Sequence, residues 1–300
     1  MNKPNIAVLL AAYNGVQWLP EQIDTIFKQE GVNLTLFISV DASSDGTEEW
    51  VSTLASERPD VVVLPHGLKF GGAAKNFFRL IRDVDFSNFD YVALADQDDV
   101  WLEDKLLRAH ALCSAQGYEA YSSSVMAFWP DGSQRLIDKS QPKTRYDYLF
   151  EPAGPGCTYV LRVRNALIFK EFLLDNWATV NEVTYHDWML YAFFRARGYK
   201  WFIDSQYKML YRQHASNQIG ANSGWRAVTS RASLLLSGWY REEVRKVTNL
   251  VGSKQDEFVQ KILAEKNAGS RLYLLRHINS TRRKTKEKWA LFLMTVFWIF

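Results

Sequence analysis

Short apolar runs alternate with segments of helical spacing through the first hundred residues of the chain. Residues 6–10 and 91–95 are almost continuously apolar, which is typical of strands buried on both faces of a parallel sheet. Between the runs, apolar residues recur every three or four positions, which predicts amphipathic helices. The predicted strands are residues 6–10, 34–40, 61–64 and 91–95, and the predicted helices are residues 18–29, 47–55 and 73–82. This alternation predicts an α/β fold, a mostly parallel sheet with helices on both faces.

The second half of the chain is less regular. Residues 118–165 contain strands interrupted by prolines, and a helical pattern returns at residues 187–197. From residue 225 the chain is helical in pattern and rich in lysine and arginine. We therefore expect a catalytic or binding domain over residues 1–224 and a basic helical region over residues 225–300.

Three carboxylates follow the predicted strand 91–95 within four residues. In an extended segment the side chains alternate, so Asp96 and Asp98 are expected on one side and Asp99 on the other. Like charges held this close resist ionising together, and a hard cation such as Mg²⁺ or Mn²⁺ removes the conflict. The alternative is that Asp98 or Asp99 caps a helix beginning near residue 102, which explains one aspartate but not three. The run therefore predicts a metal site.

Two further strand ends carry candidate ligand-binding groups. Ligands of open α/β sheets bind beyond the carboxyl ends of the strands. Tyr13 offers an aromatic face for a base, and Asp41 offers acceptors for a base N–H or a ribose hydroxyl; an Asx-turn is the alternative for Asp41. The turn after the first strand has neither G-x-G-x-x-G nor G-K-[ST], which disfavours a dinucleotide dehydrogenase or a P-loop kinase.

Composition narrows the class of protein. The 300 residues are 47% hydrophobic, enough for a sizeable core, and the net charge of +3 argues against a dedicated nucleic-acid-binding protein. Cys113 and Cys157 show no metal-binding spacing and indicate no disulfide framework, so a reducing compartment is expected. The N-terminus shows no apolar leader. We expect a cytoplasmic protein.

Three motifs, in this order and spacing, carry a resemblance to a known family. They are Ala-Ala-Tyr-Asn-Gly, Val-Asp-Ala-Ser-Ser-Asp-Gly-Thr and Asp-Gln-Asp-Asp-Val-Trp-Leu. Over residues 5–220 the chain resembles the family 2 inverting glycosyltransferases, above all the bacterial rhamnosyltransferases of surface-polysaccharide assembly such as O-antigen or capsule. The resemblance implies the nucleotide-sugar-transferase (GT-A) fold and dTDP-L-rhamnose as donor, with UDP-sugars as the alternative. Val40 stands where many relatives have a first aspartate before Asp41, which leaves the nucleotide preference open.

The resemblance also implies roles on the donor side. Tyr13 and Asp41 would hold the nucleotide base, and Asp96 and Asp98 would form a D-x-D site for Mg²⁺ or Mn²⁺ beside the diphosphate. Lys75 lies in a segment similar to one near the donor, although a helix start with an exposed lysine explains it equally well.

A second set of residues is assigned to the acceptor and the leaving group. Asp187 matches the family's general base and would accept the proton of the attacking hydroxyl; the alternative is a helix N-cap. Gly156 and Trp188 are expected on the acceptor side. Arg212 would meet the diphosphate, and His214 would complete the metal shell.

The C-terminal tail suggests contact with a membrane. Residues 281–288 are strongly basic, and residues 289–300 are largely apolar. Twelve residues make a helix of about 18 Å, too short for a hydrocarbon core of about 30 Å. We expect a peripheral anchor on the inner face of the cell membrane, near a lipid-linked saccharide acceptor. A tail packed on protein is one alternative, and a longer chain with a transmembrane helix is another. A catalytically inert membrane-bound scaffold is the non-enzymatic alternative, and the aspartates argue against it.

Overall fold

A computed structural model describes residues 3–214, 237–252, 256–263 and 267–300. It divides into two compact units, each assembled from separate segments of the chain. The sheet unit comprises Met1–Ser140, Gly154–Asp187 and Tyr199–Gln218, and the helical unit comprises Gln141–Ala153, Trp188–Gly198 and Ile219–Phe300. The predicted domain boundary at residue 224 lies outside the described residues.

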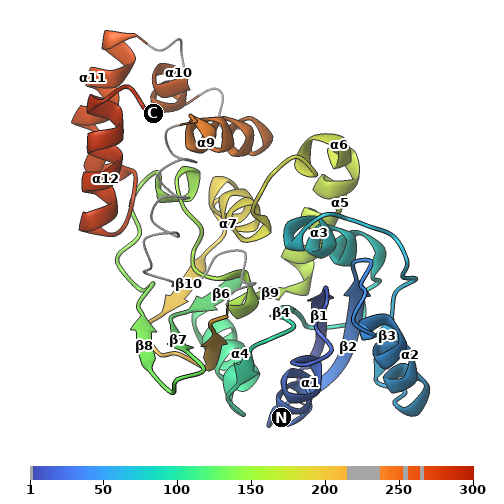
Figure 1. Ribbon diagram of the computed structural model, residues 1–300. Coiled ribbons are helices and arrows are strands. Elements are labelled where there is room, and N and C mark those ends of the chain that lie inside the picture. The colour runs from blue at the N-terminus through green and yellow to red at the C-terminus, as the bar shows by residue number, and fades with distance from the viewer. Residues whose placement is uncertain (1–2, 215–236, 253–255, 264–266) are drawn as a thin grey trace. The chain divides into compact units, whose positions relative to one another are not determined.

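A seven-stranded sheet forms the centre of the sheet unit, in the order β10-β6-β9-β4-β1-β2-β3 (Figure 1). The strands are β1 (Asn5–Ala12), β2 (Asn33–Val40), β3 (Val61–Val63), β4 (Tyr91–Asp96), β6 (Ala120–Ser123), β9 (Val160–Arg162) and β10 (Trp201–Asp204). Only β9 runs antiparallel to its neighbours, β4 and β6. The predicted mostly parallel sheet is confirmed.

The three helices predicted before residue 91 are present as α1 (Leu19–Phe27), α2 (Thr47–Glu57) and α3 (Ala73–Asp83). The sheet unit also contains α4 (Lys105–Gln116), α5 (Val163–Asp175) and α6 (Trp177–Val180). The helix expected near residue 102 begins at Lys105, because a short strand, β5 (Val100–Trp101), precedes it. The elements predicted over residues 6–95 are all present.

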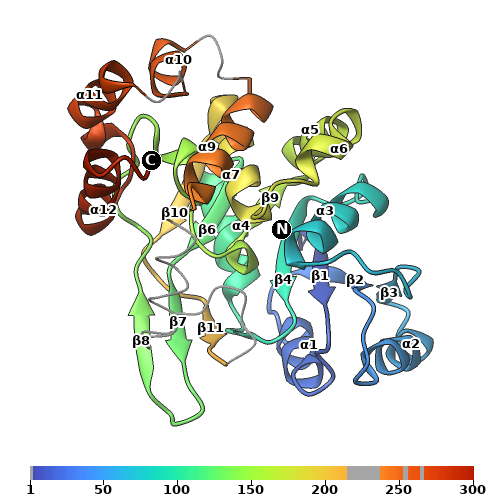
Figure 2. The same cartoon turned by 45° about the horizontal axis from the view of Figure 1, so that its top comes forward.

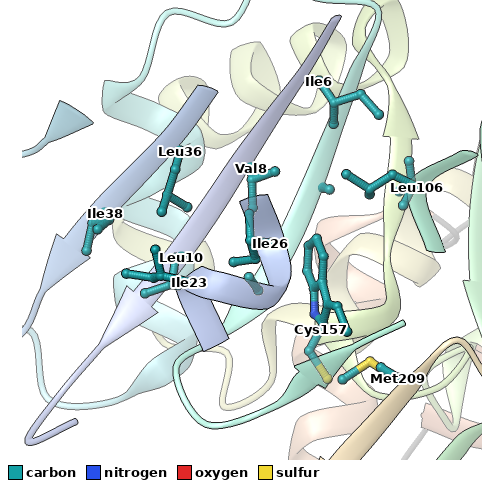
Figure 3. Packing of buried hydrophobic residues seen from close by; sticks show 14 of the residues in the cluster. Ile6, Val8, Leu10, Ile23, Ile26, Leu36, Ile38, Leu106, Cys157 and Met209 are labelled. Atoms are coloured by element: carbon teal, nitrogen blue, oxygen red, sulfur yellow. The ribbon is translucent and has the colours of Figure 1, made fainter. Parts of the chain in front are cut away.

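The core lies on both faces of the sheet. Ile6, Val8 and Leu10 are fully buried on one face of β1, where Ile23 and Ile26 of α1 pack against them (Figure 3). On the opposite face, α3 contacts β1 and β2. Alternate side chains of a strand point to opposite faces, so burial on both sides requires the continuous apolar runs seen in the sequence.

A second, four-stranded sheet brings distant parts of the chain to the acidic run. Its order is β5-β11-β7-β8, and β7 (Val125–Phe128) and β8 (Gln134–Ile137) form an antiparallel hairpin (Figure 2). β11 (Met209–Arg212) pairs with β7 on one side and with β5 on the other. The residues that follow β11 therefore lie beside those that precede β5.

The elements of the helical unit are η1 (Asp147–Leu149), the later part of α7 (His186–Ala196), α9 (Trp239–Leu250), α10 (Glu257–Leu263), α11 (Ala268–Arg276), η4 (Ile278–Ser280) and α12 (Thr285–Val296).

A buried ion-pair cluster joins three parts of the helical unit. The buried Asp147 carboxylate accepts hydrogen bonds from Arg195 at 3.0 Å, Arg283 at 3.1 Å and the Tyr191 hydroxyl at 2.8 Å. Because each charge has a partner, the cluster ties η1, α7 and the segment before α12 together.

Part of the basic tail turns inward, which corrects the expectation that the whole tail faces a membrane. Arg283 contacts the Asp147 cluster, and Arg282 forms an ion pair with Glu287 at 2.7 Å. Leu291 and Phe300 are buried. Among the residues that the structure describes, no helix has the length and apolar character needed to cross a bilayer.

Candidate active site

Three strand ends meet at one edge of the sheet unit. In the strand register, Ala11 of β1 lies opposite Asp96 of β4, and the next residue, Ala12, lies opposite Val40 of β2. The turns that carry Tyr13, Asp41 and the acidic run therefore begin at the same level of the sheet. The predicted convergence of these segments is confirmed by the register.

The acidic run concentrates charge that its surroundings do not balance. Burial, with the nearby charges of Asp98 and Asp187, raises the pKa of Asp96 to about 7. Burial and the same Asp98 charge also raise the pKa of Asp99. Within the described residues, Asp99 Oδ2 has no hydrogen-bond partner. A divalent cation near Asp96 and Asp98 would relieve this repulsion.

Asp99 does not point away from Asp96 as expected. Ligand atoms of Asp96, Asp99 and Cys157 all lie within 4.8 Å of one another. The strand ends at Asp96 and a turn follows, so the alternation of an extended chain no longer applies to Asp98 and Asp99. Burial raises the pKa of the Cys157 thiol, which keeps it protonated, so carboxylates are the better ligands for Mg²⁺ or Mn²⁺ here.

A residue just before β5, Asp98, and a residue just after β11, His214, meet directly. His214 Nε2 lies 2.6 Å from Asp98 Oδ2, and the imidazole stacks on Trp18 with the ring centroids 4.2 Å apart. Arg212 Nε donates to the Asp98 carbonyl at 2.8 Å, and its guanidinium forms an ion pair with Glu21. Carboxylate oxygens and an imidazole nitrogen are a suitable ligand set for Mn²⁺ or Mg²⁺. The sequence showed no signal for Trp18 or Glu21.

Gln97 positions Tyr13, a role that the sequence analysis missed. The Tyr13 N–H donates to Gln97 Oε1 at 2.7 Å, and Gln97 Nε2 donates to the Tyr13 carbonyl at 2.9 Å. A side chain at Gly15 would collide with Gln97, because its Cβ would lie 2.1 Å from Oε1. The Tyr13 side chain is 55% exposed. The backbone is thus fixed while the ring remains available to a ligand.

Asp41 contacts the loop that precedes α3, the helix that carries Lys75. The buried Asp41 carboxylate accepts hydrogen bonds from the backbone N–H groups of Phe70 at 2.7 Å and Gly71 at 2.9 Å. Asp41 therefore shapes the loop before α3, and its contact with a base stays a prediction. Lys75 is partly exposed in the first turn of α3, and none of the described carboxylates pairs with it.

A short helix, η2 (Gly156–Thr158), lies between the acidic run and the start of α7. A Cβ at Gly156 would lie 2.2 Å from His186 Nε2 and 3.2 Å from Asp187 Cβ, so only glycine fits. The Sγ atom of the next residue, Cys157, lies within 4.8 Å of a carboxylate oxygen of Asp96. The Cys157 side chain packs in the core near Met209 (Figure 3). The helix η2, whose Gly156 was expected on the acceptor side, therefore lies beside both Asp187 and the pair Asp96 and Asp99.

Asp187 lies in the first turn of α7, not before it as an N-cap would. Its carbonyl accepts a hydrogen bond from the Tyr159 hydroxyl at 3.3 Å, and its charge acts on Asp96. The neighbouring His186 stacks on Phe77 with the ring centroids 4.1 Å apart, and burial lowers its pKa to about 3. The imidazole is therefore neutral near pH 7, and Asp187 is the ionisable group of this pair.

Trp188 packs inside the helical unit. Only 2% of its surface is exposed, and its indole N–H donates to the Tyr148 carbonyl at 3.0 Å. This placement argues against the expected acceptor contact, since neither the ring face nor the N–H is available. The reason is the helical period: residues 187 and 188 are successive and point in directions about 100° apart.

Sequence comparisons identify relatives of the chain. The family profile described as "Glycosyl transferase family 2" matches residues 7–171. The dTDP-rhamnosyl transferase RfbG of Shigella flexneri is 41% identical over 292 residues, which is 97% of this chain and 100% of the relative. The succinoglycan biosynthesis protein ExoO of Rhizobium meliloti is 25% identical over 139 residues, 46% of this chain and 38% of the relative.

Solved structures show a similar fold. The S. aureus protein TarS, residues 1–349 in complex with UDP, has a TM-score of 0.56 at 14% identity, covering 92% of this chain and 72% of that TarS chain. The mannosyltransferase PcManGT of Pyrobaculum calidifontis in complex with GDP-Man and Mn²⁺ has a TM-score of 0.54 at 15% identity, covering 99% of this chain and 85% of that protein. At these identities the likeness concerns the fold alone.

Proposed function

Because the chain belongs to glycosyltransferase family 2 and has the GT-A fold of nucleotide-sugar-dependent transferases, we propose that it transfers L-rhamnose from dTDP-L-rhamnose to a saccharide, with inversion at the anomeric carbon. The observation that carries the proposal is the convergence of Asp96, Asp98 and Asp187 near one edge of the sheet. The near full-length similarity to a dTDP-rhamnosyl transferase supports the choice of donor. A UDP-sugar is the alternative donor.

The donor lies along the strand ends in this proposal. The exposed Tyr13 ring stacks on the base, and the loop shaped by Asp41 closes the same side. Arg212, adjacent to the acidic run, contacts the diphosphate. Asp96, Asp98 and His214 would hold Mg²⁺ or Mn²⁺, which would supply positive charge to neutralise the leaving diphosphate.

Asp187 acts as the general base. As the acceptor hydroxyl attacks the anomeric carbon, its proton passes to the Asp187 carboxylate. A bond forms between the acceptor oxygen and the sugar, and the bond between the sugar and the diphosphate breaks, releasing dTDP. The neutral His186 does not compete for the proton, since its pKa is about 3. One base and one displacement are sufficient for inversion.

The proposed acceptor is a lipid-linked saccharide at the inner face of the cell membrane, in the synthesis of a surface polysaccharide of O-antigen or capsule type. The names of two relatives, a dTDP-rhamnosyl transferase and a succinoglycan biosynthesis protein, support a role in saccharide synthesis. An inert scaffold is disfavoured, because a scaffold has no need for the three carboxylates or for a neutral histidine beside Asp187.

A donor panel tests the proposal. Calorimetric titration of dTDP-rhamnose, UDP-glucose, UDP-GlcNAc and GDP-mannose in Mg²⁺ should give the highest affinity for dTDP-rhamnose. Acceptor-dependent release of dTDP, with the product's anomeric configuration read by NMR, should show inversion. Preferential binding of a UDP-sugar would replace the donor. Absence of nucleotide release with every donor would contradict the enzymatic assignment.

A further inference from the structure

The outer side of α12 exposes an apolar stripe. Trp289, Leu293 and Phe297 are 60%, 50% and 68% exposed, and their spacing of four residues places them on one side of the helix. Val296 and Trp298, at 37% and 49%, extend the same exposed region. We call these five residues the α12 stripe. The helix is thus apolar on the side that solvent reaches, the reverse of an ordinary surface helix.

The opposite side of α12 is anchored within the helical unit. Leu291 is buried, and the Phe300 ring packs 6.0 Å from the Phe150 ring and 5.7 Å from the Tyr240 ring, centroid to centroid. α11 lies beside α12, as Figure 1 shows. Arg271 of α11 donates to the carbonyl of Thr295 at 2.9 Å. The stripe is therefore presented by a fixed backbone, so its exposure is not the result of an unpacked helix end.

Arg271 also fixes part of the stripe. Its guanidinium donates to the Val296 carbonyl and lies 3.8 Å from the centre of the Trp298 ring. A cation over an indole face holds the ring in place while leaving its edge accessible. Trp residues are enriched where apolar and aqueous phases meet.

The charge around the stripe is almost entirely positive. Over the described residues 267–300, Glu287 carries the one side-chain carboxylate, and Arg282 neutralises it at 2.7 Å. Besides Arg271, which is bound to backbone carbonyls, four cations of this segment form no ion pair with a described residue, and they are Arg276, Lys284, Lys286 and Lys288. Lys286 and Lys288 lie in α12 itself, directly before the first residue of the stripe.

We propose that the α12 stripe docks onto an anionic lipid bilayer, with α12 lying parallel to the surface at the boundary of headgroups and acyl chains. A helix of 12 residues, roughly 18 Å long, covers lipid when it lies flat but does not cross a bilayer. Anionic headgroups complement the four free cations, whereas a second copy of the same surface would oppose cation to cation in a symmetric dimer.

The inference rests on the proposed function in one respect, because that function brings the protein near a membrane. The docking itself can be tested separately, since binding to vesicles needs neither donor nor acceptor. It also revises the role expected of the tail. Arg282 and Arg283 serve the interior, and one side of α12, not the whole of residues 289–300, meets the lipid.

Vesicle co-sedimentation of the full chain tests the proposal. The probes are vesicles of phosphatidylglycerol mixed with phosphatidylcholine, and vesicles of phosphatidylcholine alone. The stripe variant Leu293→Ser/Phe297→Ser should lower partitioning onto the anionic vesicles on the order of 10-fold or more, because it removes two apolar side chains from the lipid boundary. The matched control is Leu174→Ser, which changes a leucine of α5 that is 55% exposed. The control should partition as the unchanged chain does.

A charge variant separates the two contributions. Lys286→Gln/Lys288→Gln should weaken binding to anionic vesicles and reduce its salt dependence, with little effect on phosphatidylcholine vesicles. Thermal melting should confirm that each variant folds, and calorimetry should confirm that each binds the nucleotide-sugar as before.

Equal partitioning of the stripe variant and its control would overturn the proposal. Conversion of a dimer to a monomer by the stripe substitutions, with no change in vesicle binding, would also overturn it, because a second copy would then cover the stripe. The two proposals can also fail separately. If the unchanged chain transfers no sugar from any donor but the stripe variant still loses vesicle binding, the docking surface is supported and the proposed function is not.

Discussion

Two groups of charged residues, one in each unit, are built on opposite principles. In the helical unit the buried Asp147 carboxylate is met by Arg195, Arg283 and a tyrosine hydroxyl. At the end of β4, Asp96, Asp98 and Asp99 lie close together, and fewer positively charged partners neutralise their carboxylates. A fold with balanced buried charges loses stability when one partner is removed. A surplus of one sign instead marks a candidate site that a charged ligand would complete.

Lys105 and Arg212, which lie near the acidic run, do not cancel its surplus charge. Burial lowers the pKa of Lys105 to about 7, and its ammonium group lies 3.5 Å from the centre of the Trp101 ring. Arg212 is engaged by Glu21. The difference between the two groups predicts that substitutions at β4 change chemistry with little cost in folding, and that substitutions in the Asp147 cluster do the reverse.

The largest effect is expected from Asp98→Ala. The variant loses both a carboxylate and the partner of His214, so transfer should fall by roughly 10³-fold or more, since charge neutralisation at the diphosphate supplies several kcal/mol. The fold should remain, because Asp98 lies in a turn outside the core. Nucleotide release and thermal melting measure the two properties. Full activity in the variant, or in EDTA, would contradict the metal assignment.

Arg283→Met should produce the converse result. Removing one partner leaves Asp147 buried with less compensation, which costs about 3–5 kcal/mol in the free energy of unfolding. Donor affinity should be unchanged at a temperature where the variant is folded. Urea unfolding gives the comparison, and Lys284→Met, the next residue but only half-buried, is the matched control. A loss below about 1 kcal/mol would mean that the cluster is not a source of stability.

Asp187→Asn should lower turnover by roughly 10²-fold, in line with the loss of a general base, and leave donor binding intact. Single-turnover kinetics and donor calorimetry separate the two effects. If donor affinity falls together with the rate, Asp187 belongs to the donor site. A rate near that of the unchanged chain would assign the base to another residue.

The smallest effect concerns pH. The pKa of Asp96 is about 7 in the folded chain without metal, against an ordinary value of 3.8, so the folded state binds this proton more tightly than the unfolded state. The contribution to stability is therefore present below the ordinary pKa and is lost as pH rises through about 7. Asp96→Asn, which stays neutral, should be more stable than the unchanged chain near pH 8 in EDTA.

Urea unfolding in EDTA, near pH 5 and near pH 8, measures this difference. The gain should shrink at the lower pH, where Asp96 is protonated in the folded chain, and Mn²⁺ should reverse it by stabilising the unchanged chain alone. A variant less stable than the unchanged chain at both values would show that Asp96 is not strained by its neighbours.

The alternating pattern was sufficient to predict the sheet and the edge where the site lies. Continuous apolar runs fix β1 and β4 as buried parallel strands, and parallel strands present their carboxyl ends together. Tyr13, Asp41 and the acidic run could therefore be assigned to one edge from the sequence.

The details that failed depend on turns and on contacts between distant residues. Asp99 lies beside Asp96 because the chain leaves the strand geometry there, which an alternation argument does not detect. Gln97 fixes Tyr13 from 84 positions away, and the Arg283 backbone meets Glu151 from 132 positions away. No local pattern reports such pairs. The resemblance supplied Asp187 and His214, which periodicity alone would have left as a helix start and an isolated histidine.

The most direct test of the surplus charge at β4 is the binding of Mn²⁺, followed by electron paramagnetic resonance in the presence of dTDP. The unchanged chain and Arg283→Met, which disrupts only the balanced cluster, should each bind the ion with the same affinity. Asp98→Asn, which keeps the size of the side chain and removes its charge, should lose that binding while remaining folded. Equal Mn²⁺ affinity in the unchanged chain and in Asp98→Asn would contradict the account.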